Sequence, residues 1–130
     1  MVVDTSALIA YLNGEPEAER LESVMLDASP LHLSAASLVE AGIVADRLRG
    51  ADGGRRLDSL LVRLRVEIVP LTERHAEIAR SAYHRFGKGR HPTALNFGDC
   101  FAYALARALD EPLLFVGNDF DRTDVAVASY

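Results

Sequence analysis

The sequence predicts one α/β domain, residues 1–130, with a central parallel sheet of about four to five strands and helices on both faces. Three observations support this prediction. Short apolar, β-prone runs alternate with segments of helical hydrophobic spacing, which is typical of a parallel sheet covered by helices. The length suits a single domain, and a hydrophobic content of 49% suits a packed core. No internal repeat, linker or low-complexity segment divides the chain.

The first half of the chain is expected to contain two strands and three helices. The apolar residues 1–3 are β-prone, and Asp4 can cap the helix that follows them. Asn13-Gly14 ends that helix, and Pro16 suits the first turn of the next one. The expected elements are a strand at 1–3, helices at 7–12 and 16–28, a strand at 31–33, and a helix capped by Ser34 or Ser37 that ends at Leu48.

The second half repeats this alternation. Gly50–Gly54 is typical of a loop, and the leucines that follow have helical spacing. Pro70 ends a short apolar strand, and Thr72 opens a helix. The expected elements are a helix at 57–64, a strand at 67–69, a helix at 72–86, a loop at 87–96, a helix from Gly98 or Asp99 to Leu109, a strand at 113–116, a turn at 117–123 and a short last strand at 125–127.

Acidic residues from separate segments are expected to meet at one edge of this sheet. Asp4 follows a strand directly, Asp119 follows the 113–116 strand through a short turn, and Asp99 begins a helix. In parallel α/β folds these positions lie at the carboxyl ends of the strands, where ligands bind. Oxygen-rich sites of this kind suit hard cations such as Mg²⁺ or Mn²⁺.

Glu40 is the most informative single acid. Helical spacing places it on the same face as Ala36, Ile43 and Val44, where a lone carboxylate is costly. An ordinary structural role is the alternative for each acid taken alone. Asp4 and Asp99 could be helix caps, Asp119 a turn residue, and Glu40 a side chain that reaches solvent. The set of four, from distant segments, favours a metal site.

Other chemistries find less support in the sequence. Cys100 is the only cysteine, which excludes an internal disulfide and any cysteine zinc site, and we interpret it as an inert buried thiol. The four histidines form no obvious catalytic pair, and neither a calcium-binding loop nor a phosphate-binding GxxxxGK[ST] loop is present. The N-terminus is a poor signal peptide, so we expect a soluble, cytoplasmic protein with no membrane association.

Four motifs in order resemble those of PIN domains, and specifically the VapC-type ribonuclease toxins of VapBC toxin–antitoxin systems. The motifs are Val3-Asp4-Thr5-Ser6-Ala7-Leu8, Ser37-Leu38-Val39-Glu40, Asn96-Phe97-Gly98-Asp99-Cys100 and Leu114-Phe115-Val116-Gly117-Asn118-Asp119-Phe120. The resemblance covers essentially the whole chain and implies one PIN-like domain. It also implies an Mg²⁺-dependent endoribonuclease (Mn²⁺ being an alternative) that acts on RNA, forms a homodimer and is neutralised by a cognate antitoxin.

The resemblance also implies roles for individual residues. Asp4, Glu40, Asp99 and Asp119 would be the metal ligands and the catalytic carboxylates. Asp121 or Asp124 could share the role of Asp119, because the fourth acid varies within the family. Ser6 and Asn96 match polar positions near the site. A catalytically weak module that binds a partner or RNA, and a nuclease directed to DNA or to nucleic-acid structure, remain the alternatives.

A basic strip precedes Asp99 and is the candidate RNA track. Arg80, Arg85, Lys88 and Arg90 occur with no acid between Glu77 and Asp99. Together with Ser6, the residues Arg85, Lys88 and Arg90 are the candidate substrate-binding residues. The alternative is a solvated helix face followed by a loop. The net charge of −5 includes the four site carboxylates, so the rest of the chain carries only −1.

Overall fold

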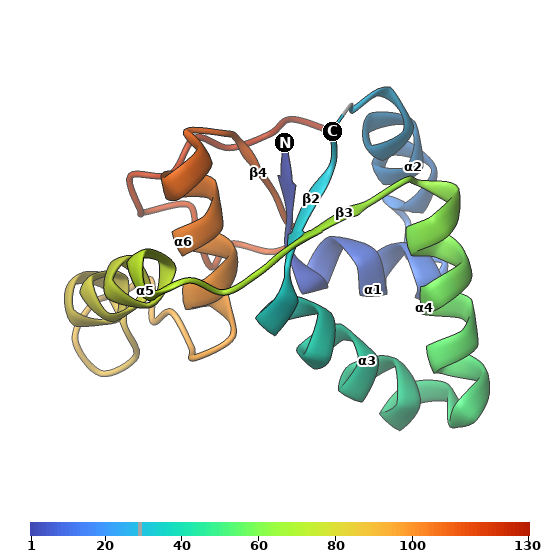
Figure 1. Cartoon of the computed structure of the whole chain (residues 1–130), viewed down its shortest axis with the longest axis horizontal. Helices are drawn as coiled ribbons and strands as arrows, with labels where there is room; N and C mark the ends of the chain where they lie inside the picture. Colours follow the sequence, from blue (N-terminus) through green and yellow to red (C-terminus); the bar gives the residue numbers. More distant parts are fainter. Residues whose placement is uncertain (29) are drawn as a thin grey trace.

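The computed structural model describes residues 1–28 and 30–130 and contains a four-stranded, fully parallel sheet (Figure 1). The strands lie in the order β3-β2-β1-β4. Their bounds are β1 Val2–Val3, β2 His32–Ser34, β3 Glu67–Val69 and β4 Leu113–Leu114. Val2 pairs with His32 on one side and with Leu113 on the other. The predicted α/β class with a parallel sheet is confirmed.

Helices cover both faces of the sheet, as predicted. The helices are α1 Thr5–Asn13, α2 Ala18–Asp27, α3 Ala35–Arg49, α4 Ala51–Arg63, α5 Glu73–Phe86 and α6 Asp99–Leu109. Helices α5 and α6 lie on one face, and α1 to α4 lie on the other (Figure 1). Successive residues of a strand point to opposite faces, so Val2 joins the core under α5 and α6 whereas Val3 joins the core under α1 to α4.

The predicted loop at Gly50–Gly54 is wrong. Only Gly50 separates α3 from α4, and both Gly53 and Gly54 lie inside α4. A Cβ atom at position 53 would lie 2.1 Å from the carbonyl oxygen of Ala45, so glycine is required here for the close packing of α4 against α3. The glycines that suggested a loop therefore serve helix packing.

The C-terminal strands are shorter than predicted. Strand β4 ends at Leu114, because the backbone N–H of Val116 donates to the Ser6 hydroxyl (3.0 Å) and not to a neighbouring strand. The expected strand at 125–127 is reduced to one parallel bridge between Leu113 and Val127. None of the helices in the described part of the chain is both long and apolar enough to cross a membrane.

Candidate metal centre

Asp4 is placed at the candidate site by the junction of β1 and α1. It is the N-cap of α1 and is only 5% exposed. Its Oδ2 atom accepts hydrogen bonds from the backbone N–H (2.9 Å) and the hydroxyl (2.6 Å) of Ser6. Burial raises the pKa of Asp4, and the charge of Glu40 raises it further, whereas the bonds from Ser6 oppose this shift. Ser6 therefore fixes the orientation of the Asp4 carboxylate.

Asp99 is held by a reciprocal pair of bonds with Asn96. The Asn96 backbone N–H donates to Asp99 Oδ2 (2.7 Å), and the Asp99 N–H donates to Asn96 Oδ1 (2.9 Å). Asp99 is 9% exposed, and burial raises its pKa to about 6. The charges of Asp4, Asp119 and Glu40 raise that pKa too, although the Asn96 bond lowers it. Asp99 therefore senses the charges of all three other candidate acids.

Glu40 reaches the site from α3. Its Oε2 atom accepts a hydrogen bond from the Thr5 hydroxyl (3.0 Å), which lies directly after Asp4 in the chain. A Cβ atom at Gly98 would lie only 2.2 Å from Glu40 Oε1. The carboxylate of Glu40 thus lies between the start of α1 and the start of α6. The buried side of α3 is formed by Ser37, Ala41 and Ala45, whereas Ile43, on the face of Glu40, is 50% exposed, so the expected apolar face is only partly buried.

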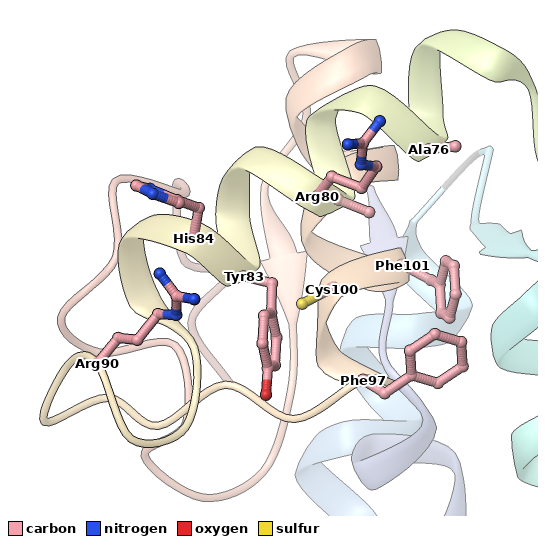
Figure 2. A pocket seen from close by; sticks show the side chains of 9 residues that line it. Ala76, Arg80, Tyr83, His84, Arg90, Phe97, Cys100 and Phe101 are labelled. Atoms are coloured by element: carbon pink, nitrogen blue, oxygen red, sulfur yellow. The ribbon is translucent and has the colours of Figure 1, made fainter.

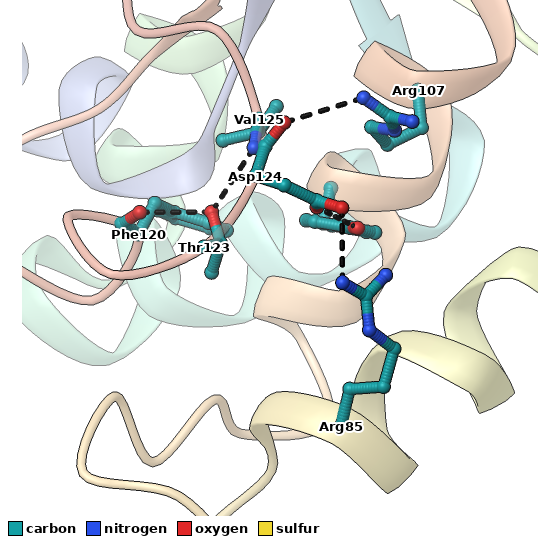
Figure 3. A network of polar contacts seen from close by, with 7 residues as sticks. Arg85, Arg107, Phe120, Thr123, Asp124 and Val125 are labelled. Atoms are coloured by element: carbon teal, nitrogen blue, oxygen red, sulfur yellow. Dashed lines mark hydrogen bonds and ion pairs between the residues drawn. The ribbon is translucent and has the colours of Figure 1, made fainter.

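Asp119 lies on the exposed turn after β4. The next residue, Phe120, is buried and packs on Phe115 with ring centroids 4.9 Å apart, which anchors the turn. Asp124 points elsewhere: it accepts a hydrogen bond from the Tyr103 hydroxyl and forms an ion pair with Arg85 at 3.1 Å (Figure 3). The Tyr103 bond, and then Arg85, lower the pKa of Asp124. These contacts leave Asp119 better placed than Asp124 to complete the acidic set.

The donor set fits a hard divalent cation. Within residues 1–28 and 30–130, no lysine or arginine forms an ion pair with any of the four acids. Burial is the main cause of the raised pKa values of Asp4 and Asp99, and repulsion between neighbouring carboxylates without a cation adds to it. As the side chains stand, no three acidic, histidine or cysteine groups of the described residues are close enough to hold an ion. Binding therefore requires side chains to turn inward, and the exposed Asp119 is free to do so.

The candidate substrate-binding residues separate into two groups. Lys88 and Arg90 are exposed on the loop after α5, and Arg90 borders a pocket between α5 and α6 (Figure 2). Arg85 instead faces Asp124 and lies over the ring of Phe86 at 4.5 Å. The basic strip is therefore divided. Lys88 and Arg90 lie on the loop after α5, whereas Arg85 lies on α5 and faces Asp124.

Some residues near the site were not singled out by the sequence. Gly98 allows the close approach of Glu40, and Thr5 bonds to it. Neither has a local signal, because each role depends on contact between distant segments. Cys100 is buried and its pKa is raised to about 11 by burial, which agrees with an inert thiol.

The fold and the site together define a class of protein: a parallel α/β domain with a carboxylate centre at the carboxyl ends of its strands. The PIN domain family model matches residues 1–126. Ribonuclease VapC of Mycolicibacterium smegmatis is 50% identical over 126 residues, covering 97% of this chain and 98% of that protein. The chain belongs to the PIN domain family, and within it to the VapC group.

Solved structures share this fold. The crystal structure of VapC20 from Mycobacterium tuberculosis, described as a Sarcin-Ricin loop cleaving toxin, superposes with a TM-score of 0.79 at 17% identity, covering 99% of this chain and 98% of that one. A toxin–antitoxin complex from Klebsiella pneumoniae gives a TM-score of 0.73 at 19% identity, covering 99% and 97% of the two chains. At these identities the likeness concerns the fold.

Proposed function

We propose that this protein is a divalent-metal-dependent endoribonuclease, the toxin of a VapBC-type toxin–antitoxin pair. The observation that carries the proposal is that the charges of Asp4, Glu40 and Asp119 all act on the buried Asp99, without a compensating lysine or arginine ion pair among the described residues. The 50% identity to a VapC ribonuclease over nearly the whole of both chains supports it.

The four carboxylates have two parts in this proposal. Asp4 and Asp99, which are buried and fixed by Ser6 and Asn96, would hold the cation, and Glu40 and Asp119 would complete the oxygen set. When bound, Mg²⁺ or Mn²⁺ lowers the pKa of a water molecule and stabilises charge on the phosphodiester. Without a cation, the negative charge of the carboxylates would repel RNA phosphates. A bound divalent cation would offset that charge and so reduce the repulsion.

Lys88 and Arg90 are proposed to guide the RNA backbone towards this centre. Both are exposed, and neither forms an ion pair within the described residues. Arg85 would have to release Asp124 before it could contact a phosphate. Replacing Lys88 and Arg90 together with Ala should weaken RNA binding and reduce the slope of log affinity against log salt concentration by roughly 1 to 2. An unchanged slope would exclude this track.

The proposed partners follow from the relatives. A cognate antitoxin is proposed because the Klebsiella pneumoniae chain of the same fold was solved in a toxin–antitoxin complex. A homodimer and a cytoplasmic location are proposed on the same family basis. Size-exclusion chromatography with light scattering, with and without the co-expressed antitoxin, would measure both assemblies.

The decisive experiment compares wild type, Asp4→Asn and Asp99→Asn on total RNA with Mg²⁺, Mn²⁺ or EDTA. We expect discrete cleavage by wild type in Mg²⁺ or Mn²⁺, and a loss of at least about 10²-fold in either variant, as expected when a metal-site electrostatic contact is removed. Asp58→Asn is the matched control, because Asp58 is exposed on α4 and outside the site. Cleavage that survives EDTA would refute metal dependence. Absence of cleavage by folded wild type would favour a binding module, and cleavage of single-stranded DNA alone would favour a DNA nuclease.

A further inference from the structure

The segment that carries Asp119 is a loop with both of its ends beside β4. It leaves β4 after Leu114, and it returns where the Leu113 N–H donates to the carbonyl oxygen of Ala126 (2.8 Å). We refer to residues 115–125 as the acidic loop. A surface loop whose ends are fixed on one strand can still shift sideways, so its lateral position depends on its contacts with other elements.

Asp124 connects the acidic loop to α5 and α6 (Figure 3). Its Oδ1 atom accepts a hydrogen bond from the hydroxyl of Tyr103, and its Oδ2 atom accepts one from the Arg85 guanidinium (3.1 Å). The carbonyl oxygen of Asp124 accepts a third bond, from Arg107 (3.2 Å). Both carboxylate oxygens already have a protein partner, which suits a residue that holds the loop better than one that binds a cation.

Tyr103 is the buried member of this group. It is 3% exposed, and its ring packs against that of Phe86 with centroids 6.0 Å apart. Burial and the bond with Asp124 raise the pKa of Tyr103 to about 12, so the hydroxyl keeps its proton and remains a donor at neutral pH. A buried hydroxyl is costly without a partner, so this bond favours one position of the loop.

Tyr103 lies on the same face of α6 as Asp99. The two residues are four positions apart, which corresponds to about 6 Å along the helix axis. The charge of Asp119 contributes to the raised pKa of Asp99, so the acidic loop lies near the start of α6. The contact at Tyr103 therefore fixes the loop relative to the helix that carries one of the two buried carboxylates.

Hydrogen bonds inside the loop connect Asp124 to Asp119. The Thr123 hydroxyl donates to the carbonyl oxygen of Phe120 (2.8 Å), and the Thr123 N–H donates to the same oxygen (3.0 Å) (Figure 3). These bonds close a turn between the two acids, and closed turns restrict the backbone torsions within them. A displacement of Asp124 is therefore expected to displace the backbone of Asp119.

We propose that Tyr103 and Asp124 are positioning residues for Asp119. Their contact holds the acidic loop at the distance from α6 at which the Asp119 carboxylate can join Asp99 on a cation. This inference rests on the proposed metal-dependent function, in which Asp119 completes the oxygen set. Arg85 contributes less, because its ion pair with Asp124 is exposed to solvent.

The test measures Mn²⁺ affinity directly, without RNA. Mn²⁺ is titrated into the metal-free protein, and free Mn²⁺ is followed by electron paramagnetic resonance. Tyr103→Phe removes the hydroxyl and Asp124→Ala removes its acceptor, and each should weaken Mn²⁺ binding by about tenfold, as when residues that orient metal ligands are lost. Asp124→Asn keeps an acceptor for Tyr103 and loses only an exposed ion pair, so it should cost at most about threefold. Wild-type affinity in Tyr103→Phe and Asp124→Ala would overturn the proposal.

A double-mutant cycle separates positioning from a general structural role. A residue that acts through Asp119 has no further effect once the Asp119 carboxylate is gone. Tyr103→Phe should therefore weaken Mn²⁺ binding when Asp119 is present and leave it unchanged in an Asp119→Asn background, which retains the other three carboxylates. An equal loss in both backgrounds would overturn the proposal.

Tyr11→Phe is the matched control. The Tyr11 hydroxyl also donates to a carboxylate, that of Glu22 (3.1 Å), and also contacts an arginine, Arg63, but it lies in the last turn of α1. This variant loses comparable bonds and should keep wild-type Mn²⁺ affinity. Thermal melting checks that each variant is folded. Asp124 is 42% exposed, so Asp124→Ala provides the test if Tyr103→Phe does not fold.

Hydrogen–deuterium exchange supplies a readout that needs no metal. In EDTA, the amides of residues 117–121 should exchange faster in Tyr103→Phe and Asp124→Ala than in wild type or Tyr11→Phe, because the loop opens more readily. Unchanged exchange would overturn the proposal. Faster exchange in a protein whose wild type binds no Mn²⁺ would refute the metal-dependent function and leave the control of the loop by Tyr103 supported.

Discussion

Replacing Gly98 with Ala should impair RNA cleavage and metal binding while changing the free energy of unfolding only slightly. The added Cβ atom would lie 2.2 Å from Glu40 Oε1 and 2.6 Å from its carboxyl carbon. Ordinary van der Waals contact begins at 3.4 Å, so the oxygen must retreat by about 1.2 Å. The clashing atoms are the end of a flexible side chain, so Glu40 should rotate away and the backbone should stay in place.

The effect on stability should be small. Gly98 has φ −64° and ψ −47°, which alanine adopts freely, so the substitution itself favours folding by ~0.4–1 kcal/mol. Against this, moving Glu40 breaks its hydrogen bond with Thr5, which is worth ~0.5–1.5 kcal/mol. The free energy of unfolding should therefore change by less than about 1 kcal/mol, the difference between these two ranges.

The effect on the centre should be large. A displacement of about 1 Å in a catalytic group can cost ~10²-fold in rate, so Gly98→Ala should lose most RNA cleavage. It should also weaken the rise in melting temperature that Mg²⁺ or Mn²⁺ gives to wild type. Urea unfolding, metal titration of the melting temperature and cleavage of total RNA measure the three quantities separately.

Gly42→Ala is the matched control for this experiment. Gly42 lies in the same helix as Glu40, and a Cβ atom there would contact nothing within 4 Å. The control should gain up to ~1 kcal/mol in stability and keep full activity, because alanine favours a helix interior. Full activity and metal response in Gly98→Ala would refute the role assigned to Glu40. A loss of several kcal/mol would show instead that Glu40 cannot move, contrary to the reasoning above.

Three further outcomes are expected. Ser6→Ala should cost ~1–3 kcal/mol in urea unfolding, because the Val116 N–H loses its acceptor; a change below about 0.5 kcal/mol would contradict this, since that is the range of ordinary surface substitutions. The pKa of Asp99 is raised to about 6 from an unfolded value of 3.8, so its protonation stabilises the metal-free fold below pH 3.8, and that stability is lost as pH rises through about 6. Melting scans in EDTA should therefore show a melting temperature that falls between about pH 4 and pH 6 in wild type and falls less steeply in Asp99→Asn, in which the raised pKa of Asp4 remains; equal slopes would exclude Asp99 as a source. Arg85→Ala should lower stability by less than about 1 kcal/mol, because its ion pair with Asp124 is exposed, and should reduce RNA affinity less than Arg90→Ala does; a larger loss in Arg85→Ala would restore Arg85 to the RNA track.

Two predictions of secondary structure were wrong, because the same local sequence pattern occurs in more than one kind of structure. The glycines at positions 50–54 suggested a loop, but Gly53 serves the contact between α3 and α4. The apolar run 113–116 suggested a strand of that length, but Ser6 intercepts the Val116 N–H and ends the ladder at Leu114. In each case the deciding partner lies far away in sequence, at Ala45 for Gly53 and at Ser6 for Val116.

The sequence by itself determined the order of strands and helices, and the resemblance of its motifs to those of PIN domains. Alternating hydrophobic periods set the parallel α/β class, and the position of Glu40 among apolar neighbours marked it as a residue that faces other segments. Strand ends and helix starts share one edge in this class, so the sequence alone predicts that Asp4 and Asp99 lie there.

Only the tertiary structure decided which way the remaining side chains point. It turned Arg85 towards Asp124, exposed Phe97, and brought Gly98 against Glu40. Periodicity and capping depend on residues a few positions apart, so they can be read from the chain. Contacts between side chains of distant segments depend on how the helices pack over the sheet, and that packing exists only in the folded molecule.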